Sequence, residues 1–169
     1  WHSICIASHS TPLKPRLAMR IVQATPEHLD LLTPLFIKYR EFYGELPLPD
    51  SSRKFLENRL TRKESVIYLA LADDEDKALG YCQLFPSFSS LSLKRVWILN
   101  DIFVAEDARR MLVADRLLQT AKQMAKSTNA VRMRVASSIN FETAHKTYES
   151  IGFREDTEFK NFVLPLDED

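Results

Sequence analysis

The feature that most constrains the fold is a continuous stretch in which strand-like patterning changes to helix-like patterning. Residues 96–104 form a mainly apolar run, residues 105–110 make a polar turn, and apolar residues then recur at helical spacing to about Lys126. A helix entered through a short turn has first-turn N–H groups without intrahelical partners, at the positive end of its dipole. The stretch therefore predicts either an anion-binding site or an ordinary strand–turn–helix packing unit.

Length and composition indicate one globular domain of an ordinary kind. The 169 residues suffice for a sizeable core, and 45% hydrophobic with 27% charged residues is typical of such proteins. The 23 basic and 23 acidic residues balance, so composition gives no global attraction to nucleic acid or to an anionic membrane. We therefore expect neither as a partner.

The sequence lacks the patterns of disulfide frameworks and metal sites. Its two cysteines, Cys5 and Cys82, are too few for either, and its four histidines show no metal-ligand spacing. No apolar run approaches the roughly 18 residues of a membrane span. We expect a cytoplasmic protein that binds no metal.

The first 18 residues differ in character from the rest. They hold three serines, two prolines and no acid, and Met19 directly precedes a strand-like run. We interpret residues 1–18 as an extension from upstream translation, a tag or a tail, and we expect the domain to comprise residues 19–169.

Periodicity and turn residues predict the order of helices and strands. Thr25 followed by Pro26 is a helix start, and Gly152 is a suitable left-handed stop. Strands are expected at 20–24, 66–72, 78–85, 96–104, 131–136, at Phe153 and at 159–166; helices are expected at 25–43, from residue 50 or 51, at about 109–126 and at 140–152.

This order predicts a mixed α/β (α+β) domain with a twisted mixed sheet of about six to seven strands, flanked by about four helices on both faces. Only three glycines occur, which excludes a glycine-rich phosphate loop and the dinucleotide-binding fold. The absence of a Gly-x-Ser-x-Gly motif argues against a serine hydrolase.

Two stretches resemble a known family. Residues 99–114, LNDIFVAEDARRMLVA, look like a strand followed by an Arg-x-x-Gly-x-Gly/Ala pyrophosphate loop, and residues 144–153, AHKTYESIGF, look like an Ala-x-x-x-Tyr-x-x-x-Gly-Phe ending. Both are motifs of the GNAT superfamily of acyl-CoA-dependent N-acyltransferases. The helix from Phe36 to Tyr43, followed by Phe55-Leu56, is also similar to the first helical pair of that family. The resemblance extends from about Arg20 to Leu166.

The resemblance implies acetyl-CoA as co-substrate, with no metal. The residues that it implies for the cofactor site are Ile102, Phe103, Val104, Arg109, Arg110, Met111, Leu112, Val113, Ala114 and Asn140. Arg110 and Leu112 stand where the family usually has glycines, although main-chain amides can still face phosphates. Asn140 lies eight residues before Tyr148, whereas the family's asparagine usually lies seven before its tyrosine, so Asn140 is either a helix cap or a site residue.

Acyl transfer from a thioester needs an unprotonated amine and an acid for the leaving thiolate. Tyr148 matches the family's tyrosine and can donate that proton; the alternative is a core aromatic. Asp101 lies within an apolar strand, where burial would raise its pKa toward that of a useful base; the alternative is an aspartate bonded to neighbouring backbone. Glu41 and Tyr43, near the end of the first helix, could meet a cationic substrate; for Glu41 the alternative is a position on the solvated face of the helix.

We therefore expect an N-acetyltransferase that moves an acetyl group from acetyl-CoA to a primary amine by direct attack in a ternary complex. The acceptor amine belongs to a small molecule or a protein. The alternatives are a catalytically weak GNAT-like module that senses an acyl-CoA or a metabolite, and an interaction domain without a CoA site. A homodimer is also left open.

Overall fold

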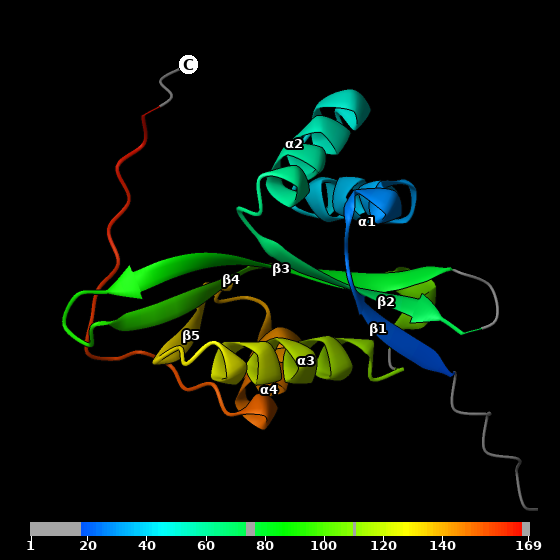
Figure 1. Ribbon diagram of the computed structural model, residues 1–169. Coiled ribbons are helices and arrows are strands. Elements are labelled where there is room, and N and C mark those ends of the chain that lie inside the picture. The colour runs from blue at the N-terminus through cyan, green and yellow to red at the C-terminus, as the bar shows by residue number, and fades with distance from the viewer. Residues whose placement is uncertain (1–17, 74–76, 110, 167–169) are drawn as a thin grey trace, which may run out of the picture.

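The computed structural model describes residues 18–73, 77–109 and 111–166, which form a five-stranded sheet with helices on both faces. Helices α1 and α2 cover one face, and α3 and α4 lie against the other (Figure 1). The elements are β1 (Met19–Gln23), η1 (Pro26–His28), α1 (Leu29–Phe42), α2 (Pro49–Thr61), β2 (Val66–Ala72), β3 (Ala78–Ser89), β4 (Lys94–Val104), η2 (Glu106–Ala108), α3 (Val113–Ser127), β5 (Arg132–Val135) and α4 (Glu142–Ile151). The predicted fold class is confirmed, with fewer strands than expected.

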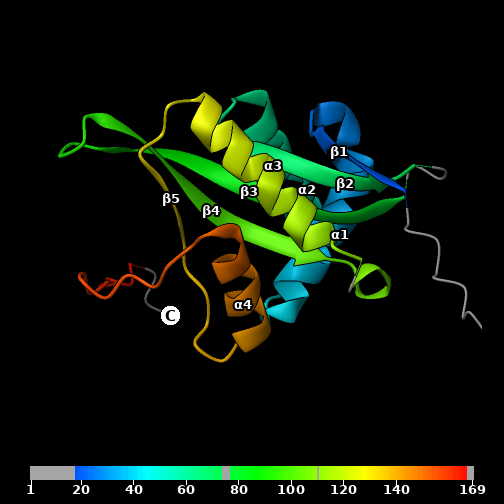
Figure 2. The same cartoon turned by 90° about the horizontal axis from the view of Figure 1, so that it is seen from below.

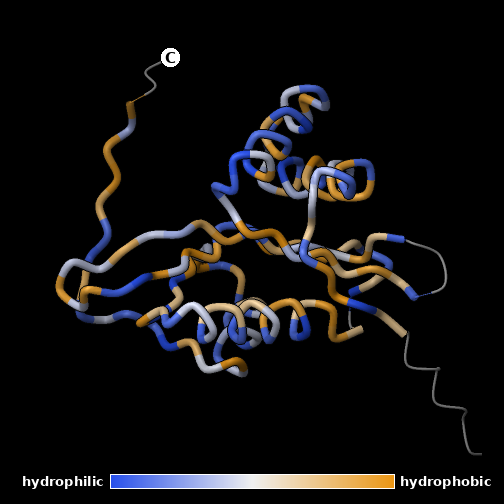
Figure 3. Tube along the Cα trace, in the orientation of Figure 1, coloured by the Kyte–Doolittle hydropathy of each residue, from blue (hydrophilic) through white to orange (hydrophobic). Residues whose placement is uncertain are grey.

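The strands follow the order β1-β2-β3-β4-β5, and all neighbouring pairs are antiparallel except the last. β4 and β5 are parallel because α3 crosses from the end of one to the start of the other (Figure 2). β2 is almost wholly buried because helices cover both faces of the sheet at its centre. Consistent with this burial, Figure 3 shows apolar residues concentrated along the central strands.

The helices pack through the apolar stripes that the sequence predicts. In α1, the buried positions Leu29, Leu32 and Phe36 recur at intervals of three and four. Thr25 begins this segment through a reciprocal capping arrangement with His28. In α3, the stripe that includes Leu117, Leu118 and Ala121 is fully buried against the sheet, and the other buried members are Val113 and Ala125.

One irregularity in the sheet positions the site. The β3–β4 register shifts between Gln83 and Leu84, so that Gln83 pairs with Asp101 and Leu84 pairs with Leu99. Asn100 is the extra residue of this β-bulge, and a bulge re-aims the side chains that follow it. Asp101 is therefore buried while Asn100, next to it, is exposed.

Two predicted helix starts are wrong. α3 begins at Val113 rather than at about Arg109, because the chain first forms η2 and then Leu112 adopts a left-handed conformation with φ 61°. α4 begins at Glu142 with Phe141 as its N-cap, so Asn140 is not the cap. The predicted stop at Gly152 is confirmed by its left-handed φ of 109°.

The strands predicted at Phe153 and at 159–166 are not present. The chain beyond α4 shows no regular pairing (Figure 1), although Arg134 of β5 donates a hydrogen bond to Asn161 in this segment. The apolar pattern of this segment indicates an extended backbone, but a strand also needs backbone hydrogen bonds to a neighbouring strand, and no described strand pairs with this segment. Residues 1–17 lie outside the described part, so the predicted boundary at Met19 stays a prediction.

Candidate active site

The candidate site opens where β4 and β5 separate. The two strands pair only from Val96 with Arg132 to Leu99 with Val135. Beyond Leu99, β4 continues to Val104 beside β3 alone, while the chain after β5 turns away toward α4. The backbone of residues 100–104 thus has no strand partner on its β5 side among the described residues. A cleft of about 850 Å³ occupies the gap.

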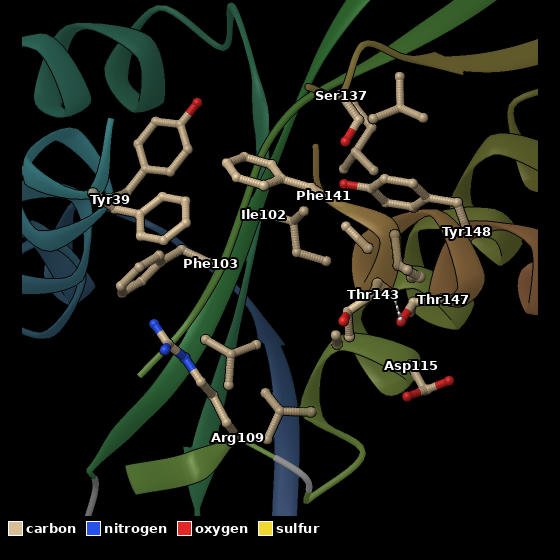
Figure 4. Close-up of a pocket in the computed structure, with 18 of the residues that line it drawn as sticks. Tyr39, Ile102, Phe103, Arg109, Asp115, Ser137, Phe141, Thr143, Thr147 and Tyr148 are labelled. Carbon is tan, nitrogen blue, oxygen red and sulfur yellow. Dashed lines mark hydrogen bonds between the residues drawn. The ribbon is translucent and has the colours of Figure 1, made fainter. Parts of the chain in front are cut away.

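Four parts of the chain line this cleft: the end of α1, the second half of β4, the loop into α3 with its first turn, and the segment from β5 into α4. Figure 4 shows Tyr39 and Phe103 on one side and Tyr148, Thr143 and Thr147 on the other, with Ile102 between them. The sheet supplies a rigid floor, and the helices supply the side chains that face across it.

The start of α3 lines the cleft with first-turn amides that have no partner within the helix. The first backbone bond of this helix runs from the N–H of Arg116 to the oxygen of Leu112, so the amides of Val113, Ala114 and Asp115 have no intrahelical partner. Their N–H groups and the helix dipole favour an anion there. Gly80 of β3 lets this end pack closely on the sheet, because a Cβ at Gly80 would lie 3.1 Å from Val113 Cγ1 in the first turn of α3.

Basic side chains near this helix start have different surroundings. Arg109 is exposed and lines the cleft (Figure 4). Arg116 instead donates to the backbone oxygen of Met19 at 2.8 Å, which ties α3 to β1. Asp107, in η2, pairs with Lys77. Arg109 is therefore the described basic side chain that is placed to meet an anion in the cleft.

The Tyr148 phenol lies in the cleft on α4. Its hydroxyl points toward the gap beside Phe141 (Figure 4). Burial raises the pKa of Tyr148 above its ordinary value, and the nearby Tyr43 raises it further. The phenol therefore keeps its proton at neutral pH, as a proton donor must. The Tyr148 ring also packs against Phe153 in a T-shaped arrangement, with centroids 5.7 Å apart, so Tyr148 both packs against the core and lines the cleft.

Asp101 forms a buried hydrogen-bond network on the face of the sheet that α1 covers. Its Oδ2 accepts from Gln83 Nε2 at 2.8 Å and from the Tyr81 hydroxyl at 3.3 Å, and its Oδ1 accepts from Asn100 Nδ2 at 2.6 Å. Burial raises the pKa of Asp101, and these three donors oppose that rise. Its hydrogen bonds go to side chains rather than to the neighbouring backbone that the alternative interpretation assumed.

Asp101 lies behind the cleft rather than on its surface. It is not a lining residue, but its charge contributes to the raised pKa of Tyr39, which is one. The carboxylate therefore influences the cleft through the aromatic residues in front of it. Its role as a base stays a prediction.

The structure brings most of the predicted site residues into one cleft. Those that line it are Tyr43, Ile102, Phe103, Val104, Arg109, Leu112, Val113, Ala114, Asn140 and Tyr148. Met111 and Glu41 are exposed and do not line it. Arg110 lies outside the described residues.

Sequence reasoning missed the aromatic residues Tyr39, Phe42 and Phe141. The three-and-four spacing of Tyr39, Phe42 and Tyr43 carried a signal, because it places all three on one face at the end of α1. Phe141 gave no signal, because its position depends on how the loop after β5 folds back toward α1.

Comparisons with known proteins now identify the family. The model of the Acetyltransferase (GNAT) family matches residues 30–153, which includes the whole cleft. The chain belongs to the GNAT family. The resemblance in its motifs is thereby confirmed, and the protein is an acetyltransferase.

Relatives of similar length agree with this assignment. The "Uncharacterized N-acetyltransferase YhfO" of Bacillus subtilis is 38% identical over 146 residues, covering 86% of this chain and 97% of that protein. A "Probable acetyltransferase" of Haemophilus influenzae is 34% identical over 148 residues, covering 88% of this chain and 99% of that protein.

Solved structures also match the GNAT fold. A crystal structure of a "probable acetyltransferase" is 75% identical, with TM-score 0.85, over 89% of this chain and 99% of that one. An aminoglycoside N-acetyltransferase, AAC(6')-Iy in complex with CoA, shares 22% identity at TM-score 0.72, over 89% of this chain and 96% of that one; at this identity the likeness shows the fold alone.

The described residues contain neither a candidate metal site nor a candidate membrane-spanning helix. No group of three or more His, Cys, Asp or Glu side chains in this part of the chain could hold a metal ion. None of its helices combines the length and apolar character that a membrane crossing requires.

Proposed function

We propose that this GNAT protein moves the acetyl group of acetyl-CoA to a primary amine by direct attack in a ternary complex. One observation carries the proposal: the unpaired edge of β4, the free amides at the start of α3 and the Tyr148 hydroxyl all line a single cleft. These are an edge that can hydrogen-bond an extended chain, an anion site and a proton donor. We also propose that the protein is cytoplasmic, as expected from its two cysteines.

The cleft offers separate sites for the parts of acetyl-CoA. The backbone of Ile102, Phe103 and Val104 can pair with the amide groups of an extended pantetheine arm. The amides of Val113 and Ala114, together with Arg109, suit the pyrophosphate. This division follows from the chemistry of each part and from the order of the segments along the cleft.

The reaction needs the residues near the point where the strands separate. The amine nitrogen attacks the thioester carbonyl carbon, so that a C–N bond forms as the C–S bond breaks. Tyr148 gives its proton to the departing sulfur, which leaves as the thiol. The amine loses one proton, for which Asp101 is the candidate acceptor through water, and proton exchange restores the phenol.

Tyr148→Phe tests the proposal, because it removes the proton and keeps the ring. We expect kcat to fall about 10²–10⁴-fold, the usual worth of a positioned acid, with the Kd for acetyl-CoA and the melting temperature close to wild type. Thiol release across a panel of amines measures kcat, and calorimetry measures Kd.

Tyr68→Phe is the matched control, because Tyr68 is a buried tyrosine of β2 that does not line the cleft. We expect this variant to keep its kcat. Full activity in Tyr148→Phe, or an equal loss in the two variants, would remove Tyr148 from the reaction.

A sensor without turnover is the second candidate, and one observation favours it. The side chain of Leu112 lines the cleft at a position where the GNAT pattern has glycine. A side chain there narrows the approach to the amides of α3. Binding of acetyl-CoA without thiol release from any amine would support the sensor, whereas turnover would exclude it.

A further inference from the structure

Aromatic side chains gather at the end of the cleft formed by α1. We name five of them the aromatic wall: Tyr39, Phe42, Tyr43, Phe103 and Phe141. Ring centroids lie 5.1 Å apart for Tyr39 and Tyr43, 5.3 Å for Phe42 and Tyr43, and 5.5 Å for Phe42 and Phe141. Tyr39 also meets Phe103 at 6.5 Å. The wall thus joins α1, β4 and the loop before α4 into one continuous apolar surface.

This surface lies beside the proposed reaction point. Tyr148 lines the same cleft, and Phe141 of the wall lies next to its hydroxyl (Figure 4). The phenols also interact electrostatically: Tyr43 contributes to the raised pKa of Tyr148, and Tyr148 contributes to that of Tyr39. A molecule that touches the wall is therefore close to the thioester carbon of the proposed ternary complex.

The outer part of the wall is open to solvent. Phe42 is 54% exposed and Tyr43 is 53% exposed, although their rings pack against each other and against Phe141. Large aromatic side chains exposed together around a cleft mark a surface that binds an apolar group. This opening also gives an acceptor a route into the cleft.

The charges around the wall select the acceptor further. The described residues contribute three charged side chains to the cleft lining: Arg109, Asp115 and Glu142. Arg109 and Asp115 belong to the loop and first turn that begin α3, and Glu142 begins α4. None belongs to the wall. Glu142 directly follows Phe141 of the wall, and Asp101 is buried where its charge contributes to the raised pKa of Tyr39.

Aromatic faces backed by a single buried carboxylate suit a single cationic nitrogen on an apolar body. The faces attract an ammonium group through their quadrupoles, and Asp101 adds one negative charge behind them. A polyamine or aminoglycoside would instead need several exposed carboxylates to pair its other ammonium groups, whereas the described lining of the cleft holds one exposed carboxylate, Glu142, and the partly buried Asp115 at the start of α3.

We propose that the acceptor is a small primary monoamine whose amino group is carried on an aromatic or bulky apolar group that packs against the aromatic wall. This inference rests on the proposed function, because it names the acceptor of that reaction.

A panel of five amines tests the inference with the full chain. It contains 2-phenylethylamine, 2-cyclohexylethylamine, spermidine, kanamycin and a lysine peptide, each with acetyl-CoA, and kcat/KM is measured by thiol release. We expect 2-phenylethylamine to exceed the two polycations and the peptide at least tenfold. We expect it to exceed 2-cyclohexylethylamine severalfold, because the latter has the same apolar bulk without the aromatic ring.

Tyr43→Leu supplies the matching variant, because its exposed ring can be replaced without emptying the core. It should raise the KM for 2-phenylethylamine about tenfold, more than it lowers kcat, and leave the Kd for acetyl-CoA unchanged. Phe88→Leu is the control: Phe88 is 73% exposed on β3, does not line the cleft, and should change neither constant.

The outcomes separate the two proposals. Faster turnover of spermidine, kanamycin or the peptide, or an unchanged KM in Tyr43→Leu, would overturn the acceptor inference and leave the acetyltransferase reaction standing. Binding of acetyl-CoA without turnover of 2-phenylethylamine would also overturn it. Failure to bind acetyl-CoA would instead refute the proposed function, and the acceptor inference would fall with it.

Discussion

Replacing Leu112 tests whether backbone strain is stored at the start of α3. Leu112 has φ 61° and ψ 21°, in the left-handed region, and it is 53% exposed. A residue with a Cβ costs roughly 1–2 kcal/mol in this region, whereas glycine enters it without that cost. Glycine in turn loses about 0.5–1 kcal/mol through its greater freedom in the unfolded chain.

The comparison that isolates this strain is Leu112→Gly against Leu112→Ala. Both variants lose the half-buried leucine side chain, so its packing contribution largely cancels between them. The left-handed conformation destabilises the alanine variant, and the greater freedom of the unfolded chain destabilises the glycine variant by a smaller amount. Leu112→Gly should therefore be about 0.5–1 kcal/mol more stable than Leu112→Ala. For a chain of this length that is roughly 1–4 °C in melting temperature.

Gln123 supplies the control pair because it is exposed within α3 at ordinary helical geometry. There Gln123→Gly should be about 1 kcal/mol less stable than Gln123→Ala. The predicted result is therefore a reversed order of glycine and alanine at the two positions, measured by urea denaturation. If Leu112→Ala is at least as stable as Leu112→Gly, the left-handed conformation is not retained and the strain argument fails.

Two further substitutions test the packing and the electrostatics around the cleft. Gly80→Ala places a Cβ 2.7 Å from the Phe103 oxygen and 3.1 Å from Val113 Cγ1, so β4 and α3 must both shift away from residue 80 on β3. We expect the free energy of unfolding, measured by urea denaturation, to fall by about 1–3 kcal/mol, and acetyl-CoA to bind more weakly. Wild-type stability and binding would mean that these contacts relax without cost. Asp101→Asn tests the pH dependence of stability, because burial raises the pKa of Asp101 in the folded state. Between the unfolded pKa of about 4 and the higher folded value, the native state binds more protons than the unfolded state. In this window the Asp101 carboxyl group contributes a stabilisation of the wild type that decreases as pH rises. The free energy of unfolding of Asp101→Asn minus that of wild type should therefore increase across this window and then level off, whereas a difference independent of pH would contradict the shift.

The parts of the site that could be predicted from sequence depend on local order along the chain. The strand, turn and helix around residues 99–114 follow from periodicity, and their contact with the cleft follows from the first-turn amides of α3. Gly152 is the C-cap of the short helix that carries Tyr148, so the local Tyr-x-x-x-Gly pattern predicts both the end of α4 and the helical position of the phenol. These features need no knowledge of distant contacts.

The parts that could not be predicted depend on contacts between distant segments. The β-bulge at Asn100 decides that Asp101 is buried toward α1, and it arises from the register with β3 rather than from the local pattern. Phe141 reaches the aromatic wall only through the loop after β5. Glu41 lies close to Tyr43 in sequence, yet the turn of the helix carries it out of the cleft lining.

The apolar pattern beyond α4 shows the limit of strand prediction. Residues 159–166 have the composition of a strand, and the segment is extended, but pairing requires a second strand at the right place. A short stretch of sequence shows how readily it forms a strand, but it does not show whether a second strand lies beside it in the fold. The number of strands was therefore less predictable than the class of the fold.

The last strand of the sheet affects how this protein behaves in concentrated solution. Among the described residues, β5 pairs only with β4. The nearby segment, in which Asn161 accepts a hydrogen bond from Arg134 of β5, exposes Phe162, Leu164 and Leu166. An open edge beside apolar side chains favours association of one molecule with the next. Arg132 and Arg134, exposed along β5, oppose it because two such edges repel each other. Added salt screens this repulsion, so dilute buffer should keep the protein monodisperse better than concentrated salt.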